Sequence, residues 1–100
     1  MPTFTLDKNP VGYRQLAVST SAVALSAATG GIPVSAKRAV ITVEANDVRW
    51  RDDNVAPTAS VGMLAKSTTI FELPSIQSIY GFQAIRASAD AIINITYYGA

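Results

Sequence analysis

Two segments of the sequence alternate between side chains that suit a protein core and side chains that suit its surface. The segments are residues 38–45 and 91–98. In the first, one face carries Ala39, Ile41, Val43 and Ala45 and the other carries Arg38, Val40, Thr42 and Glu44. In the second, one face carries Ile93, Ile95 and Tyr97 and the other carries Ile92, Asn94, Thr96 and Tyr98. A period of two residues is typical of β-strands, whose successive side chains point to opposite faces of a sheet. Both segments are also rich in β-branched residues, which favour strands. We therefore predict two half-buried strands and a fold built on sheets.

Shorter strand candidates lie between turn-forming residues that recur about every ten positions. The candidates are residues 13–19, 22–26, 48–51, 68–73, 75–80 and 82–89. We expect the last of these to form a hairpin with the C-terminal strand through Asp90. Residues 19–28 also fit helical spacing, because they contain several alanines, but a helix this short would be marginal and the neighbouring segments indicate strand.

The length of 100 residues allows one domain with a real hydrophobic core. We predict an all-β, single-domain antiparallel β-sandwich over residues 13–100, either a jelly roll or an immunoglobulin-like Greek key, which share the same local patterns. Residues 1–12 are expected to form an extended N-terminal arm that either crosses a neighbouring molecule or frays. We find no signal peptide and no apolar run of about 20 residues, so we expect a soluble protein.

The chain contains no histidine and no cysteine. These absences exclude a cysteine or histidine nucleophile, a serine–histidine pair, a thiolate or imidazole zinc site and any disulfide. Most acidic residues fall at expected turns, and only Glu44 and Glu72 lie within expected strands, each on the polar side. We therefore predict no enzyme, no cofactor and no catalytic residue. A net charge of +1 likewise argues against a nucleic-acid partner, and no membrane partner is expected.

Arginines, a tryptophan and acidic residues are concentrated in residues 49–54. If residues 48–51 form a strand, Trp50 shares one face with Val48 and packs in the core, although an exposed tryptophan could instead anchor a partner. The two arginines then lie on the other face, where they bind either a partner's carboxylates or the adjacent aspartates. The predicted partner-contact residues are Arg49, Arg51, Asp52, Asp53 and Asn54.

The same acidic cluster does not predict a metal site. Asp47 and residues 52–54 offer oxygen ligands, but their spacing does not match a calcium-binding loop with ligands at alternate positions and a distant glutamate. Aspartate and asparagine bonding to their own backbone in a turn explain the cluster more simply.

Charged residues make up only 15% of the chain, against about 25% in ordinary soluble domains. A β-rich surface with few lysines and glutamates lacks the usual protection against edge-to-edge association. Interface cores are depleted in charge in the same way. The composition therefore favours a self-associating homo-oligomer or a component of a larger scaffold, and the alternative is a soluble domain that is merely rich in alanine, serine and threonine.

One stretch resembles a segment of small structural proteins of tailed bacteriophages and prophages. Residues 48–63 read VRWRDDNVAPTASVGM, close to the family form VRWRDDG-x-APTASVGM. Residues 25–33, LSAATGGIP, and the terminal ITYY at 95–98 also fit the family pattern. Asn54 stands where the family has glycine, and both residues tolerate a left-handed turn. The resemblance covers about residues 16–100.

The resemblance implies a virion component without enzymatic activity, assembled in the host cytoplasm. Its most direct form is a capsid decoration or cement protein that contacts the major capsid protein, or another virion protein, across subunit junctions. The alternative is a structural or adhesion module of the tail, neck or fibre. Affinity in such an assembly comes from multivalent, symmetric contact rather than from one deep pocket.

Overall fold

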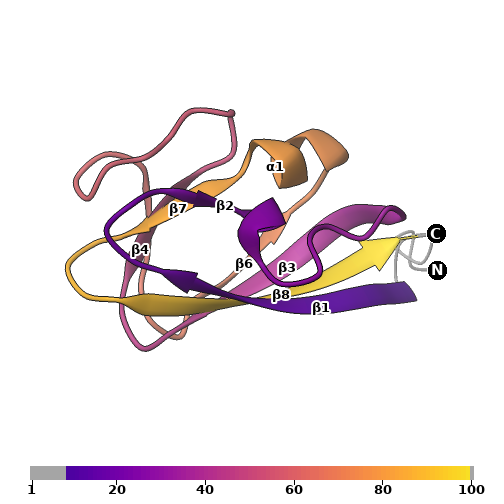
Figure 1. Ribbon diagram of the computed structural model, residues 1–100, viewed down its shortest axis with the longest axis horizontal. Helices are drawn as coiled ribbons and strands as arrows, with labels where there is room; N and C mark the ends of the chain where they lie inside the picture. Colours follow the sequence, from indigo (N-terminus) through magenta and orange to yellow (C-terminus); the bar gives the residue numbers. More distant parts are fainter. Residues whose placement is uncertain (1–8, 100) are drawn as a thin grey trace, which may run out of the picture.

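A computed structural model describes residues 9–99 and consists mainly of strands packed in two layers (Figure 1). The strands are β1 (Asn9–Val18), β2 (Val23–Ala24), β3 (Ala36–Glu44), β4 (Val48–Arg51), β5 (Met63–Ala65), β6 (Ile70–Leu73), β7 (Gln83–Arg86) and β8 (Ala91–Gly99). A 3₁₀ helix, η2 (Leu25–Ala27), follows β2, and a short helix, α1 (Ile76–Gly81), follows β6. The predicted all-β fold class is confirmed at this level.

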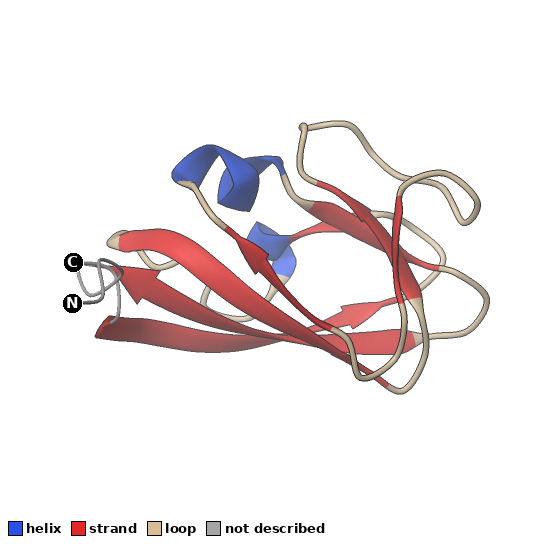
Figure 2. Cartoon of the chain, turned by 180° about the vertical axis from the view of Figure 1, so that it is seen from behind, coloured by secondary structure: helices blue, strands red, loops and turns tan. Residues whose placement is uncertain are grey.

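The strands form two antiparallel sheets of four, with orders β1-β8-β3-β6 and β2-β7-β4-β5. Figure 2 shows the strands from behind, in red, with the two helices in blue. We call the sheets sheet A and sheet B. Within them the first strand pairs with the eighth, the second with the seventh, the third with the sixth and the fourth with the fifth. The chain is thus one long antiparallel ribbon, folded back on itself and divided between two layers.

Four short connections join the two sheets, and they consist of residues 19–22, 45–47, 66–69 and 87–90. Each connects a strand of one sheet to the strand in the matching position of the other, so β5 and β6 form the two edges on the same side of the sandwich. Side chains of one connection bind the backbone of others: Asn46 Nδ2 donates to the Asp90 carbonyl, and Asp47 Oδ1 accepts from the Ser67 backbone amide, both at 2.8 Å.

The core lies between the sheets and contains inward side chains of both, together with Leu25 of η2 and Ile79 of α1. Ala39, Ile41 and Val43 of β3 are buried, as the alternation predicts. Ala45, which the same alternation placed with them, lies beyond the end of β3, has a positive φ of 79° and is exposed. So are Ile93, Ile95 and Tyr97 of β8, the strand that lies in the middle of sheet A between β1 and β3. Long, regular alternation therefore marks the two strands that each contribute more core side chains than any other element.

The predicted hairpin between residues 82–89 and the last strand is wrong. β7 pairs with β2 and β4 in sheet B, whereas β8 pairs with β1 and β3 in sheet A. The link through Asp90 is short, but it crosses between layers instead of reversing within one. A short loop is compatible with either path, so loop length alone did not decide the pairing.

The predicted strand at residues 75–80 is also wrong, because this segment forms α1. The Ser75 hydroxyl accepts a hydrogen bond from the Ser78 amide at 3.1 Å and caps the helix, as serine commonly does. Ile79 packs inward while Ile76 and Tyr80 are exposed. The predicted strand at residues 22–26 is strand only in β2, and its remainder becomes η2.

The first described strand begins earlier than expected. β1 starts at Asn9, so residues 9–12 of the predicted arm belong to the edge of sheet A. Residues 1–8 of that arm lie outside the described residues. The sequence pattern also did not predict β5, a strand of only three residues.

Candidate interaction surface

β4 places the predicted site residues on both faces of sheet B. Val48 and Trp50 face inward, and Trp50 packs against the core cluster while remaining partly exposed. Arg49 and Arg51 face outward, where Arg49 lies opposite Ile85 of β7 and Leu64 of β5. The structural interpretation of Trp50 is confirmed, and the two arginines share one face as predicted.

Arg51 binds an aspartate of its own chain. Its guanidinium donates two hydrogen bonds to the Asp53 carboxylate, Nε to Oδ1 at 3.0 Å and Nη2 to Oδ2 at 2.5 Å. This contact raises the pKa of Arg51 and lowers the pKa of Asp53, with the hydrogen bonds between them as the largest cause in both cases. The pair is solvent-exposed, so it orients the turn more than it stabilises the fold.

Asp52 and Asn54 attach the turn to α1. The Ser78 hydroxyl donates to Asp52 Oδ2 at 2.8 Å, and the backbone amide of Asn54 donates to the Gly81 carbonyl at 3.1 Å. A Cβ atom on Gly81 would lie 2.6 Å from the Asp52 carbonyl oxygen, so the two backbones approach too closely for any other residue. Asn54 has a positive φ of 63°, a conformation that asparagine tolerates well.

Arg49 lies under the loop of residues 52–62. Its Nη1 donates to the Gly62 carbonyl at 3.1 Å, while its Nε is buried without a hydrogen-bond partner within residues 9–99. Pro57 of this loop is buried. Gly62 has a positive φ of 139°, and a Cβ atom there would lie close to Pro57 and to the Trp50 carbonyl oxygen. Arg49 therefore holds the loop against sheet B, whereas Arg51 and residues 52–54 form one corner at the surface.

Two open hollows flank this corner. One of about 370 Å³ is lined by Arg51, Asp52, Asp53, Gly62 and Met63. The other, of about 430 Å³, is lined by Asp52, Asp53, Asn54, Gln77, Tyr80 and Gly81. Among the described residues no three acidic side chains gather in a group that could hold a metal ion. The corner offers shape and charge for a partner's side chains.

A set of exposed apolar side chains, which the sequence pattern did not predict, lies beside this corner. Along the side formed by the edge strands β5 and β6 and the preceding loop, the exposed large apolar residues are Val55, Val61, Met63, Leu64 and Ile70. We call these five residues the apolar edge. Met63 and Leu64 are adjacent large apolar residues in the sequence, and this pair was the available signal. Leu64 lies opposite Arg49 on the outer face of sheet B, whereas Ile70 lies opposite Thr42 on the outer face of sheet A, so the five residues follow one side of the molecule rather than one face. Exposed apolar side chains along one side are candidates for contact with a partner.

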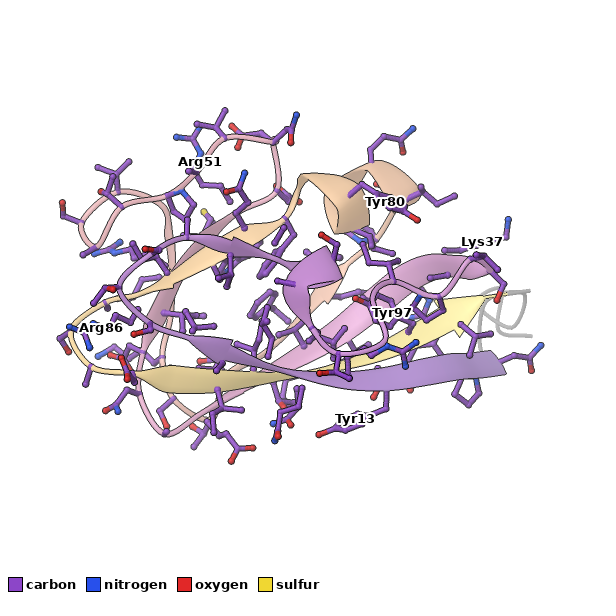
Figure 3. All side chains as sticks on the ribbon, in the orientation of Figure 1. Tyr13, Lys37, Arg51, Tyr80, Arg86 and Tyr97 are labelled. Atoms are coloured by element: carbon purple, nitrogen blue, oxygen red, sulfur yellow. The ribbon has the colours of Figure 1, made fainter. Side chains whose placement is uncertain are left out.

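The outer face of sheet A is a second surface, and its polar groups bind one another. Asn94 Oδ1 accepts hydrogen bonds from the Tyr13 hydroxyl at 2.5 Å and from Gln15 Nε2 at 3.1 Å, and Asn94 Nδ2 donates to Glu44 at 2.5 Å. Arg38 forms an ion pair with Glu72 at 2.7 Å. In Figure 3, Tyr13 projects on the opposite side of the molecule from Arg51 and Tyr80. This face is satisfied internally and needs a partner less than the apolar edge does.

No family model, curated protein or solved structure matches the chain. Within residues 9–99, no helix has the length and apolar character needed to cross a membrane.

Proposed function

We propose that the chain is a non-enzymatic structural protein of a tailed-bacteriophage virion, a decoration or cement protein that binds the major capsid protein on the head. The observation that carries this proposal is the apolar edge, which lies on a β-sandwich whose charged residues make up only 15% of the chain. The resemblance of residues 48–63 to small phage structural proteins supplies the biological setting. The corresponding location is the virion, after assembly in the host cytoplasm.

The finer fold that goes with this proposal is the jelly roll. Its support is the pairing of strands one with eight, two with seven, three with six and four with five, divided between two four-stranded sheets. Eight-stranded jelly rolls built from two Greek keys recur in viral capsid and lectin domains. The immunoglobulin-like alternative has different sheet compositions.

Cementing acts through the burial of surface across junctions between capsid subunits. Each apolar side chain that leaves water contributes about 25 cal/mol per Å² of apolar surface. Many symmetric copies add their contacts, so a modest surface on each copy produces a strong total effect. Leu64 projects from a short edge strand and is well placed for such contacts.

A carbohydrate-binding fibre module is the competing function. Such a module stacks sugars on neighbouring exposed aromatic side chains. Tyr13 and Tyr80 are both exposed, but they lie on opposite sides of the molecule in Figure 3 and do not form one platform. We therefore favour the head as the docking site.

The test mixes the purified chain with heads that lack it, pellets the heads and measures both bound protein and the temperature at which the heads release DNA. We expect saturable binding and a higher release temperature. Leu64→Glu should weaken binding, because it places a charge in the apolar edge. Ala17→Glu is the matched control, since Ala17 is exposed on β1 in sheet A. Binding to purified tails but not to heads would support the tail or fibre alternative, and binding to neither would refute the proposal.

A further inference from the structure

Val34 lies at the tip of a turn and exposes its whole side chain. The Ala36 amide donates to the Pro33 carbonyl at 3.1 Å and closes the turn that leads into β3. Val34 has a relative accessibility of 102%. Glycine, asparagine, aspartate and serine dominate such positions, and a β-branched apolar residue has no local role there. Its side chain projects as an apolar knob that folding of the single chain does not use.

The hollow beside Met63 is a suitable acceptor for such a knob. Its volume of about 370 Å³ is open to solvent, and Met63 on its wall is 61% exposed. Met63 lies opposite Trp50 in the register of β4 and β5, so the hollow adjoins the partly exposed margin of the aromatic core. Methionine adapts its shape to an incoming side chain better than branched residues do.

The charges beside the knob and the hollow are complementary. Lys37, three residues after Val34, is exposed and forms no ion pair with any of residues 9–99. The hollow is lined by Arg51, Asp52 and Asp53 and carries a net charge of −1. A lysine that arrives with the Val34 turn would meet this excess of carboxylate.

One molecule cannot make this contact with itself. Figure 3 shows Lys37 near one end of the long axis and Arg51 in the other half of the molecule, and that axis extends 41 Å. The turn and the hollow are both part of the rigid sandwich. The contact must therefore join two copies.

We propose that the Val34 turn of one copy docks into the hollow beside Met63 of the next copy, with Lys37 pairing with the carboxylates of Asp52 and Asp53. This proposal rests on the proposed function, and the partner in the contact is a second copy of this chain. Two different surfaces meet, so the interface is heterologous and generates a ring if the rotation closes or a filament if it does not. A ring around a symmetry axis of the head is the form that suits a cement protein.

Disulfide trapping tests the contact directly, because the chain has no cysteine of its own. Two single variants, Val34→Cys and Met63→Cys, are mixed and oxidised under mild conditions. We expect the mixed disulfide to exceed each homodimer by clearly more than the twofold excess that random pairing gives, since a disulfide requires Cα atoms about 4.4–6.8 Å apart. The double variant should give a ladder of covalent oligomers. Ile70→Cys replaces Met63→Cys as the matched control, because Ile70 is equally exposed but lies outside the hollow. Equal trapping with Ile70→Cys would overturn the proposal.

Light scattering coupled to size-exclusion chromatography measures the same contact without a crosslink. Val34→Asp should weaken self-association about tenfold to a hundredfold, the loss expected when one valine is no longer buried. Lys37→Glu and Asp53→Lys should each weaken it, and the variant that combines both reversals should recover it. Every substituted side chain is exposed, so circular dichroism should remain that of the native fold. Oligomers that are insensitive to Val34→Asp would overturn the proposal.

The two proposals fail separately. A chain that binds heads but remains monomeric at high concentration, with no trapping between positions 34 and 63, would overturn the head-to-tail contact and leave the cement function standing. A chain whose oligomers depend on Val34 but that ignores heads and tails would support the contact and remove the virion function.

Discussion

The indole of Trp50 lies flat against the ring of Phe71, with ring centroids 4.7 Å apart and an angle of 2° between the planes. Trp50 belongs to β4 in sheet B and Phe71 to β6 in sheet A, so the stack joins the two layers. Phe82 completes the cluster, with its centroid 5.6 Å from that of Trp50. Because β5 and β6 are short, these rings do much to close the sandwich on the side that carries the apolar edge.

Replacing Trp50 with alanine should therefore destabilise the whole domain. We expect a loss of about 3 kcal/mol, the lower end of the range for large aromatic side chains, because the indole is partly exposed. Trp50→Phe should lose much less, since a ring can still stack on Phe71. Urea unfolding measures both losses. Circular dichroism is the signal, because both variants lack the only tryptophan and cannot be monitored by its fluorescence. Equal losses would show that the stack itself contributes little.

The parts of the fold that could be predicted are those in which one sequence pattern has one structural solution. The alternating segments at 38–45 and 91–98 became β3 and β8, because a misregistered strand would expose a whole row of core side chains. Segment 48–51 became β4 with the predicted bounds. The strand predicted at 75–80 failed because Ser75 caps a helix, and isoleucine and tyrosine are compatible with either structure.

The candidate site was predictable in composition but not in partners. The sequence left open whether the arginines bind Asp52 and Asp53 or a partner, and the structure pairs Arg51 with Asp53 while Asp52 binds Ser78. Ser78 is 26 positions away in the chain, so no local pattern could indicate it. Met63 is exposed because β5 lies at the edge of sheet B, and Val34 is exposed because its turn projects before β3. The turn-forming residues in the sequence do not reveal how the sheets are assembled, so neither exposure could be predicted.

Tyr97 offers a test of a buried group without a partner. It is fully buried on β8, and its hydroxyl makes no hydrogen bond within residues 9–99. Burial, more than any neighbouring charge, raises the pKa of Tyr97 to about 12. Tyr97→Phe should increase the free energy of unfolding by about 1 kcal/mol, because a buried unsatisfied hydroxyl costs about that much or more.

The matched control for Tyr97→Phe is Tyr98→Phe. Tyr98 faces outward, with the Arg38 guanidinium 4.9 Å from its ring centroid, and losing its hydroxyl should leave stability unchanged. Thermal and urea unfolding of both variants give the comparison. Destabilisation by Tyr97→Phe would mean that the hydroxyl has a bonding partner, such as a buried water.

Gly81 is required by the close approach of α1 to the turn at Asp52. Gly81→Ala places a methyl group against the Asp52 carbonyl and should cost about 1–3 kcal/mol, the usual penalty for overpacking. It should also loosen residues 52–54, because the Asn54 amide bonds to the Gly81 carbonyl. Hydrogen exchange at the Asn54 amide reports the loosening, and urea unfolding reports the stability.

Gly31→Asn is the control for Gly81→Ala. Gly31 has a φ of 64°, and no atom lies within 4 Å of the place that a Cβ atom would take there. Asparagine tolerates that backbone conformation, so we expect little change in stability. If Gly31→Asn destabilised as much as Gly81→Ala, the effect at Gly81 could not be assigned to contact with Asp52.

Asp90 should make stability depend on pH in the acid range. Its carboxylate accepts hydrogen bonds from the Ser19 hydroxyl at 2.8 Å and from Arg86 Nη1 at 2.7 Å. The Ser19 hydroxyl, followed by Arg86, lowers the pKa of Asp90 in the folded state. A lowered pKa adds stability above the ordinary carboxyl value of about 4, and that stability is lost as the pH falls through the folded value. The free energy of unfolding should therefore be level near neutral pH and decline below about pH 4.

Ser19→Ala isolates the contribution of the hydroxyl to this acid sensitivity. Removing the largest cause of the shift should move the pKa of Asp90 back toward its ordinary value and flatten the decline in stability below about pH 4. Titration of the Asp90 carboxyl carbon by nuclear magnetic resonance measures the pKa directly in both proteins. Ser26→Ala, which removes an exposed hydroxyl from η2, should leave the Asp90 titration unchanged. A wild-type Asp90 that titrates at the ordinary value would show that its two hydrogen bonds do not persist in solution.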